Sequence, residues 1–385
     1  SYLFDYASCA RKYERDLTDA QHKNGCFPQI VPVGGTDFYM RSMDGSAGWS
    51  DAGVFLPWEI YHRYGDDAIL KDNYDAMKAY ARFKVKSLGR WYPTARPTGV
   101  HGKPRRWISN YGQSYGEWAE PADVKPMVIS DFVSPHPEES TAYLVLLLDR
   151  MAEIAAILGK KADADEYHSL AGKVRLGYQA LVRTEKHSLD TDRQAKLVRP
   201  LALRLLDETQ TVFAQRRLVQ ALDRYGWRLG TGFLSTPLIL YVLADMDIAF
   251  AYRLLENEEI PGWLSMPKNG ATTIWESWEG PDAQGGVASL NHYSKGAVCQ
   301  WLFDTMCGIR VAGENRFLIA PRPGGSFTRA GAKYNSVFGM AESGWEKTET
   351  GWRFRVTVPA GCTAKVVLPD GSAREQEAGT ASYTV

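Results

Sequence analysis

The sequence has no surplus of charge of either sign. It carries 45 basic and 45 acidic side chains in 385 residues, so its formal net charge is zero. Proteins that hold nucleic acid by its phosphates usually carry a basic surplus, because each phosphate contact replaces a counterion. The balance gives no support to a nucleic-acid partner. No apolar run is long enough to cross a bilayer, so no membrane partner is expected either.

Cysteine is scarce and scattered. The five cysteines, an odd number, are Cys9, Cys26, Cys299, Cys307 and Cys362. None are spaced as CxxC, and no Cys/His cluster has zinc-ligand spacing, so neither a disulfide framework nor a metal site is expected. The chain also lacks a glycine-rich phosphate loop, a GxSxG nucleophile motif and an HExxH zinc motif. No cofactor is therefore expected.

Aromatic residues are abundant, at 12% of the chain, with 12 Trp and 20 Tyr. One explanation is a large aromatic core. The other is sugar binding, because flat rings stack on the apolar faces of pyranoses. Composition alone leaves both open.

The first 308 residues are predicted to be mainly helical. Helical spacing of apolar residues occurs in the ranges 1–21, 49–66, 68–91, 136–160, 162–182, 209–225, 235–244, 246–256 and 293–306, and more weakly in 196–206. Long connections alternate with short ones, and the longest, 92–136, holds six prolines. A connection of that length in a compact domain is usually functional or disordered, and its aromatic content argues against disorder. This pattern is typical of an (α/α) toroid with its working loops at one end.

After about residue 308 the pattern changes to short alternating runs separated by Gly, Pro and Asn. This predicts a small antiparallel β-sandwich. The expected domains are therefore residues 1–308 and 309–385. A structural cap on the toroid is favoured over a separate carbohydrate-binding module.

Carboxylates embedded among aromatics are the composition that a glycosidase needs, since one acid protonates the leaving oxygen while another activates water or attacks carbon. Aromatic walls also raise a carboxyl pKa by desolvation. The first such cluster places Asp51 near Trp49 and Trp58; the second places Glu117 beside Trp118. From spacing alone, Asp51 is more simply a helix N-terminal acid and Glu117 an ordinary loop acid.

The third cluster, "PGWLSMPKNGATTIWESWEGPDAQGG", places Glu276 between Trp275 and Trp278. A carboxylate between two indoles is costly unless it is paired or functional, so a functional role is favoured for Glu276. Glu279 and Asp282 are expected to be solvated.

Two further groups of polar residues are weighed in the same way. His292 begins a predicted helix shortly after the third cluster. A lone histidine is more often a cap or core residue, but its nearness to Glu276 favours a hydrogen bond to a sugar. Glu14, Asp16 and Asp19, on the first predicted helix, are expected to be surface charges.

Several segments together resemble glycoside hydrolase family 78, the α-L-rhamnosidases. "GTGFLSTPLILYVLADMDIAFAYRLL", "PGWLSMPKNGATTIWESWEG" and "SLNHYSKGAV" are similar to successive segments of that family, and "GWSDAGVFLPWEIYHRYGD" to an earlier one. "SYGEWAEP" resembles the family's Tyr-Gly-Asp-Trp loop, with Glu117 where Asp is usual. The order matches, and the resemblance covers essentially the whole chain.

The resemblance implies an (α/α)6 catalytic barrel followed by a C-terminal β-sandwich. It implies inverting hydrolysis of terminal α-L-rhamnosides, with a rhamnose-containing oligosaccharide or glycoside as the partner. Glu276 occupies the position of the family's general base. Trp263, Trp275 and His292 match residues that line the sugar pocket.

One departure from the family concerns the general acid. The family's acid is a glutamate in an Arg-Asp-Glu-Arg segment, and no such segment occurs here. It is expected upstream of Ser1, because in the family it precedes the helix that residues 1–21 resemble. The nine or ten predicted helices also fall short of the twelve in a six-hairpin toroid. The chain is thus interpreted as a fragment with an incomplete barrel, expected to be inactive or nearly so when isolated. Its missing N-terminal part is a further partner to be considered.

Two other functions remain open. One is a different carbohydrate-active enzyme on the same toroid, such as another glycosidase or a polysaccharide lyase. A lyase would use Tyr115 near a cationic uronate site formed by Arg105 and Arg106. The other is a non-catalytic glycan-binding protein, for which the absent acid segment is the support.

Overall fold

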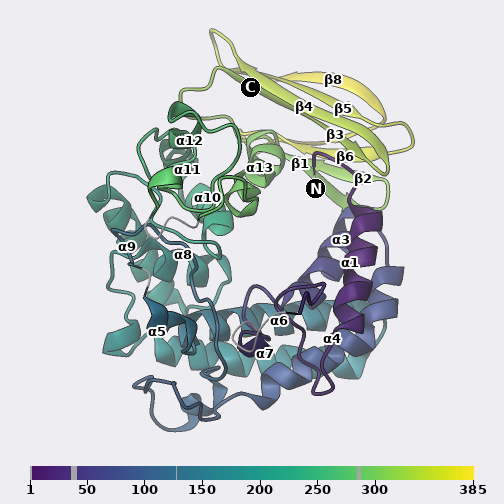
Figure 1. The fold of residues 1–385 in the computed structure, drawn as a ribbon. Helices are drawn as coiled ribbons and strands as arrows, with labels where there is room; N and C mark the ends of the chain where they lie inside the picture. The colour runs from purple at the N-terminus through teal and green to yellow at the C-terminus, as the bar shows by residue number, and fades with distance from the viewer. Residues whose placement is uncertain (1, 36–40, 127, 284–287) are drawn as a thin grey trace.

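A computed structural model describes residues 2–35, 41–126, 128–283 and 288–385 (Figure 1). The main helices are α1 (Ala7–Asp19), α3 (Ala52–Tyr64), α4 (Ala68–Lys86), α6 (Pro137–Ile157), α7 (Lys161–Leu181), α8 (Gln194–Ala202), α9 (Glu208–Arg224), α10 (Thr236–Met246), α11 (Ile248–Leu255) and α13 (Val298–Trp301). Shorter helical segments are η1 (Lys103–Trp107), α5 (Ile129–Phe132), η2 (Glu185–His187), α12 (Ser265–Lys268), η3 (Gly280–Asp282), η4 (Ser294–Ala297) and η5 (Leu302–Met306).

Short turns join the helices in pairs, α3 to α4, α6 to α7, α8 to α9 and α10 to α11. Figure 1 shows these pairs following one another around a ring. A short turn makes its two helices antiparallel, so the long connections enter the next pair from the same end of the ring. The predicted mainly helical first part of the chain is confirmed, and its long loops gather where a site can be built.

Local signals in the sequence explain where individual helices begin and end. Asp207 starts α9 with a capping box, in which its side chain accepts a hydrogen bond from the Gln210 N–H while the Gln210 side chain accepts one in return. Helix α3 ends at Gly65, whose φ of 70° is in the left-handed region that glycine adopts without strain. Pro137 opens α6, where its missing N–H costs nothing.

The C-terminal part contains two four-stranded sheets. The strands are β1 (Ile309–Gly313), β2 (Arg316–Ile319), β3 (Arg329–Ser336), β4 (Gly339–Lys347), β5 (Trp352–Val358), β6 (Thr363–Val367), β7 (Ala373–Gln376) and β8 (Gly379–Thr384). The sheet orders are β1-β2-β6-β7 and β3-β4-β5-β8. The predicted antiparallel pairing holds for every pair but one, since β2 and β6 run parallel. Between β2 and β6 the chain passes through β3, β4 and β5 of the other sheet, so no hairpin joins these two parallel strands.

The two parts share one apolar core, which includes both helical and sheet residues. At their junction the Trp345 indole N–H donates to the carbonyl of Met306 at 2.9 Å. Near the N-terminus the Tyr2 hydroxyl donates to the carbonyl of Ile309 at 2.9 Å, and its ring stacks on Phe303 with centroids 4.8 Å apart. The sheets therefore pack directly on the helices.

Three expectations from the sequence need correction. The first helix begins at Ala7 rather than at residue 1, which lies outside the described residues. The predicted helix 293–306 is divided into η4, α13 and a π-helical turn, η5. Glu14 is not a surface charge, because α1 turns it inward and leaves it fully buried, unlike exposed Asp19.

Candidate active site

Glu276 is held in place by the segment that follows it in the sequence. Its N–H donates to the Ser289 carbonyl at 2.9 Å, and its Oε2 accepts from the Ser289 N–H at 2.9 Å. A further bond, from the His292 N–H to the Ile274 carbonyl at 2.8 Å, continues this pairing. Part of the intervening glycine-rich loop, 284–287, lies outside the described residues. These bonds fix the Glu276 carboxylate while leaving it partly exposed.

The second aromatic cluster of the sequence meets the third at this carboxylate. The Trp118 indole Nε1 lies 3.4 Å from Glu276 Oε1, across a separation of 158 residues. A hydrogen bond of this length is weak. The Trp118 indole nevertheless forms one wall of the site, because it lies against the Glu276 carboxylate.

A row of aromatic rings extends from Trp118. Its ring lies 5.5 Å from that of Tyr115, which lies 4.6 Å from Trp49. Trp49 stacks near Phe233 at 6.4 Å, and Phe233 lies 5.1 Å from the His292 ring. The structure thus brings the predicted Trp49, Trp118 and His292 together. Sequence reasoning did not select Phe233, because it follows a glycine-rich turn without a neighbouring carboxylate.

Trp263 and Trp275 lie behind this row, each only 6% exposed. The Trp263 indole N–H donates to the Lys295 carbonyl at 2.9 Å. The Trp275 ring covers Gly280, where an added Cβ would lie 2.2 Å from the indole. These two tryptophans shape the loop that carries Glu276 rather than presenting a ring face to solvent.

Lys295 is a fully buried cation that sequence reasoning missed. Its Nζ donates to the backbone carbonyl of Glu276 at 2.7 Å, and it lies 4.5 Å from the Trp278 ring centroid and 5.1 Å from that of Phe233. Burial lowers the pKa of Lys295 to about 7, against the opposing charges of Glu279, Glu117 and Glu276. The signal available in the sequence was a lysine on the apolar side of the helical run "SKGAVCQW".

Glu117 points away from this surface and is fully enclosed. It accepts hydrogen bonds from the N–H groups of Gly232 and Ser235 at 3.1 and 2.8 Å, and from the Ser235 hydroxyl at 2.7 Å. The Arg199 guanidinium pairs with it at 2.5 Å. Glu117 is therefore neither an exposed loop acid nor a rim contact; it anchors the loop that carries Trp118.

Asp51 is also fully buried, at the N-cap position of α3. It accepts from the Gly48 N–H and the Tyr80 hydroxyl, each at 2.8 Å. Burial raises the pKa of Asp51, and the positive charge of Lys84 opposes that effect. The carboxylate does not cap α3 through its own helix N–H groups, so its role is to tie α3 to α4.

Trp58 belongs to α3 and contacts α6. Its indole N–H donates to Glu153 at 2.8 Å, and the Arg150 guanidinium lies 3.5 Å from its ring centroid. The structure places it in this helix contact and not in the aromatic row.

The acids expected to be solvated behave differently. Asp282 is exposed, as predicted. Glu279 is only partly exposed and accepts from the Ala122 N–H at 2.9 Å, so it joins the Glu276 loop to the Trp118 loop.

The residues weighed for a lyase are used elsewhere. Tyr115 belongs to the aromatic row, and its hydroxyl is hydrogen-bonded to Gln29. Arg105 and Arg106 lie exposed on η1, where Arg106 covers the Trp107 ring at 5.3 Å.

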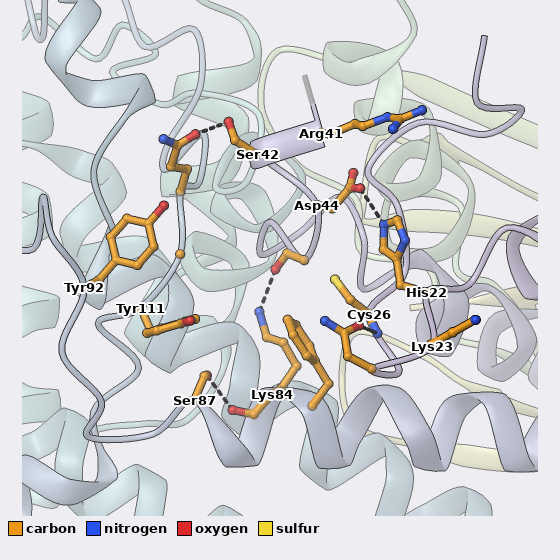
Figure 2. Close-up of a pocket in the computed structure, with 15 residues that line it drawn as sticks. His22, Lys23, Cys26, Arg41, Ser42, Asp44, Lys84, Ser87, Tyr92 and Tyr111 are labelled. Carbon is orange, nitrogen blue, oxygen red and sulfur yellow. Dashed lines mark hydrogen bonds and ion pairs between the residues drawn. The ribbon is translucent and has the colours of Figure 1, made fainter. Parts of the chain in front are cut away.

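A cavity of about 600 Å³ lies between the 20–51 and 87–136 connections (Figure 2). Its charged groups mostly have partners within the protein. His22 pairs with Asp44 at 2.7 Å, and the Lys84 ammonium donates to the Gly45 carbonyl at 2.8 Å. The cavity is lined by polar residues and lies next to the aromatic row. The segment 111–118 joins the two, since its first residues line the cavity and Tyr115 and Trp118 belong to the row.

Two further searches cover the part of the chain that the structure describes. No three His, Cys, Asp or Glu side chains there are grouped as metal ligands. No helix among those residues is long and apolar enough to cross a membrane.

Comparisons with known proteins decide the family. Residues 1–306 match the bacterial α-L-rhamnosidase 6 hairpin glycosidase domain, and residues 310–382 match the bacterial α-L-rhamnosidase C-terminal domain. The chain belongs to the bacterial α-L-rhamnosidase family. The six-hairpin helical domain and the sheet domain that the sequence predicted are thereby confirmed.

Individual relatives agree with this assignment. An α-L-rhamnosidase of Streptomyces avermitilis is 32% identical over 378 residues, which cover 96% of this chain and 33% of that protein. A crystal structure of the Streptomyces avermitilis α-L-rhamnosidase with L-rhamnose matches 99% of this chain and 36% of its own, at 30% identity and a TM-score of 0.81. The α-L-rhamnosidase structure from Dictyoglumus thermophilum matches 98% of this chain and 44% of its own, at 26% identity and a TM-score of 0.84. The chain spans about a third of the curated relative's length.

Proposed function

We propose that the protein containing this chain removes terminal α-L-rhamnosyl residues from glycosides or polysaccharides, with inversion at the anomeric carbon. The observation that carries the proposal is the Glu276 carboxylate, fixed by Ser289 and walled by Trp118 in a chain of the α-L-rhamnosidase family. The relative whose structure contains L-rhamnose supports the sugar class.

In the proposed mechanism Glu276 is the general base. It takes a proton from a water molecule as the water oxygen bonds to the anomeric carbon and the glycosidic C–O bond breaks. A general acid on the opposite face protonates the departing oxygen, and the two carboxyl groups of such a pair lie about 6.5–9.5 Å apart. We assign the acid to a part of the protein outside this chain. This chain contains no Arg-Asp-Glu-Arg segment, and the matched residues make up only 33% of the Streptomyces avermitilis relative. The isolated chain should then have little or no activity.

The proposed sugar contacts are Trp49, Trp118, Phe233 and His292, whose rings form one row beside Glu276. Rings present flat apolar faces to the sugar, and the imidazole adds a hydrogen bond. Trp263 and Trp275 are proposed as supports for the Glu276 loop. Asp51, Glu117 and Trp58 are left out of the contact set, because the structure gives each of them partners within the protein.

The proposed domain division remains residues 1–308 for the barrel and 309–385 for the sheets. The last helical turn of the first part ends at Met306, and β1 begins at Ile309. The sheets act as a structural cap in this proposal.

The experiment is hydrolysis of an aryl α-L-rhamnoside by the longer protein, followed by proton NMR within the first turnovers. The proposal predicts that β-L-rhamnose appears before the equilibrium mixture, because water attacks from the face opposite the leaving group. First release of the α-anomer would contradict the inverting assignment. An ultraviolet-absorbing unsaturated product from an acidic polysaccharide, with no rhamnoside hydrolysis, would favour a lyase instead.

A further inference from the structure

One segment of this electrically balanced chain carries charge of a single sign. Residues 76–116 contain no Asp or Glu, but four lysines and five arginines. Its later part, 88–110, folds beside the end of α7, where Val100 and Ile108 pack with Leu181 in a small apolar cluster of their own. This later part is therefore an ordered basic surface, on which Arg90, Arg96, Lys103, Arg105 and Arg106 are exposed.

A cavity of about 490 Å³ lies in this segment. Its lining includes Arg90, Arg96, Arg105 and His101, together with the Trp91 ring, which is 73% exposed. No carboxylate is among its described lining residues. The volume falls within the range of about 300–1,000 Å³ typical of small-molecule sites.

The cationic groups of this cavity are not neutralised by the protein. Among the residues that the structure describes, the guanidinium groups of Arg90, Arg96 and Arg105 form neither an ion pair nor a hydrogen bond. Lys186 is a fourth cation near Arg96: burial and the charge of Arg96 lower its pKa, and the charge of Glu138 opposes them. The cavity shown in Figure 2 differs in this respect, because its His22 is paired with Asp44.

An unpaired acceptor completes the cavity. Asn110 donates through Nδ2 to the Arg96 carbonyl at 3.1 Å, but its buried Oδ1 has no partner among the described residues. A buried polar atom normally finds a hydrogen bond, so this oxygen is suited to a hydroxyl donor.

We propose that this cavity is a second carbohydrate-binding site, specific for an anionic glycan. A sugar ring stacks on Trp91, its carboxylate or sulfate lies between Arg96 and Arg105, and a hydroxyl donates to Asn110. Arginine is suited to this task because its guanidinium binds carboxylate and sulfate oxygens in pairs. None of these residues belongs to the Glu276 site, so the inference stands independently of the proposed hydrolysis.

A single-stranded nucleic acid is the other ligand that combines negative charge with flat rings. Such ligands are bound by a groove that follows the backbone and offers stacking rings for successive bases. Here one exposed indole adjoins a compact cavity, and the whole chain has no basic surplus. These features favour a short stretch of acidic sugars.

The test measures binding to the 385-residue chain by calorimetry at low salt. The probe is trigalacturonate, its methyl ester is the uncharged control with the same rings, and a sulfated trisaccharide distinguishes sulfate from carboxylate recognition. Preferred binding of either charged glycan over the ester is expected. Arg96→Gln with Arg105→Gln should weaken it at least about tenfold, and Trp91→Ala should also weaken it about tenfold. Arg329→Gln, an exposed arginine on β3, is the matched control and should leave it unchanged.

The proposal would be overturned by equal binding of the acid and its ester, by no binding of either charged trisaccharide, or by affinity unaffected in the folded double variant. Stronger binding of a short single-stranded oligonucleotide at the same salt would also overturn it. Circular dichroism of each variant confirms that it is folded.

Discussion

At the scale of single residues, Glu14 gives the clearest stability prediction. Both of its carboxylate oxygens are buried without a partner among the described residues, and burial raises its pKa from 4.5 to about 9. Between these values the unfolded chain releases a proton that the folded chain keeps, so the free energy of unfolding falls as pH rises. The expected slope is on the order of 1 kcal/mol per pH unit.

Glu14→Gln should make this fall shallower by about 1 kcal/mol per pH unit, as measured by urea unfolding between about pH 5 and pH 7. Asp19→Asn, an exposed acid of the same helix, should keep it. A slope unchanged in Glu14→Gln would show that the carboxyl is not held protonated.

Lys295 is predicted to have the opposite effect. Its folded pKa of about 7 lies below the ordinary 10.5, so between these values the unfolded chain binds a proton that the folded chain does not. The free energy of unfolding should therefore rise with pH above about 7, again by on the order of 1 kcal/mol per unit. Between about pH 7 and pH 9 this rise offsets the fall due to Glu14.

The Lys295 effect is best measured in the Glu14→Gln background, where the rise above about pH 7 should be visible. Adding Lys295→Met should flatten this rise, since methionine replaces most of the apolar stem of lysine but cannot titrate. A rise that persists after Lys295→Met would assign it to another group.

At the scale of elements, Glu117 joins three parts of the barrel. It links the Trp118 loop to Arg199 on α8 and to the N–H groups that precede α10. Removing one partner of a buried ion pair costs about 3–5 kcal/mol when the other charge is left uncompensated. Arg199 keeps a second carboxylate, Glu139, at 3.1 Å, so Glu117→Gln should lower the free energy of unfolding by about 3 kcal/mol, the lower end of that range.

The control is Glu258→Gln, which removes an ion pair with Lys268 whose side chains are 59% and 61% exposed. Exposed pairs contribute about 0–1 kcal/mol, so this variant should be close to wild type in urea unfolding. Equal effects of the two substitutions would refute the anchoring role of Glu117.

The elements were predictable where one local pattern determines them. Helix α6 was expected at 136–160 and spans Pro137–Ile157, because its apolar repeat and the proline at its first position act locally. The parallel β2–β6 pair was not predictable, since its partners are far apart in sequence.

The candidate site also has one feature that a local pattern predicted and others that depend on distant residues. Glu276 stood out through its neighbouring indoles, but its contact with Trp118 spans 158 residues. Burial of Glu117 and Lys295 depends on which helices face them, and that cannot be read from spacing. An acid beside a tryptophan occurs at both Glu276 and Glu117, and the residues alone favoured function only for Glu276, which has an indole on each side. Neither pattern predicted that Glu117 is enclosed with Arg199 while Glu276 stays partly exposed.

At the scale of the whole molecule, the helices and sheets should unfold together. They share one apolar core, and hydrogen bonds such as Trp345 to Met306 and Tyr2 to Ile309 join them. A continuous core without a linker makes the two parts cooperative. Calorimetry should show a single transition, and two separated transitions would contradict this interpretation.

The central claim is that Glu276 is the general base, and one substitution tests it most directly. In the longer protein, Glu276→Gln should lower kcat on an aryl α-L-rhamnoside by about 10²–10⁴-fold, because the amide cannot take the proton of water. Rhamnose binding and the unfolding midpoint should change little, and Asp282→Asn, exposed after the same segment, should keep full activity. A Glu276→Gln protein that retains more than about a tenth of wild-type kcat would contradict the account.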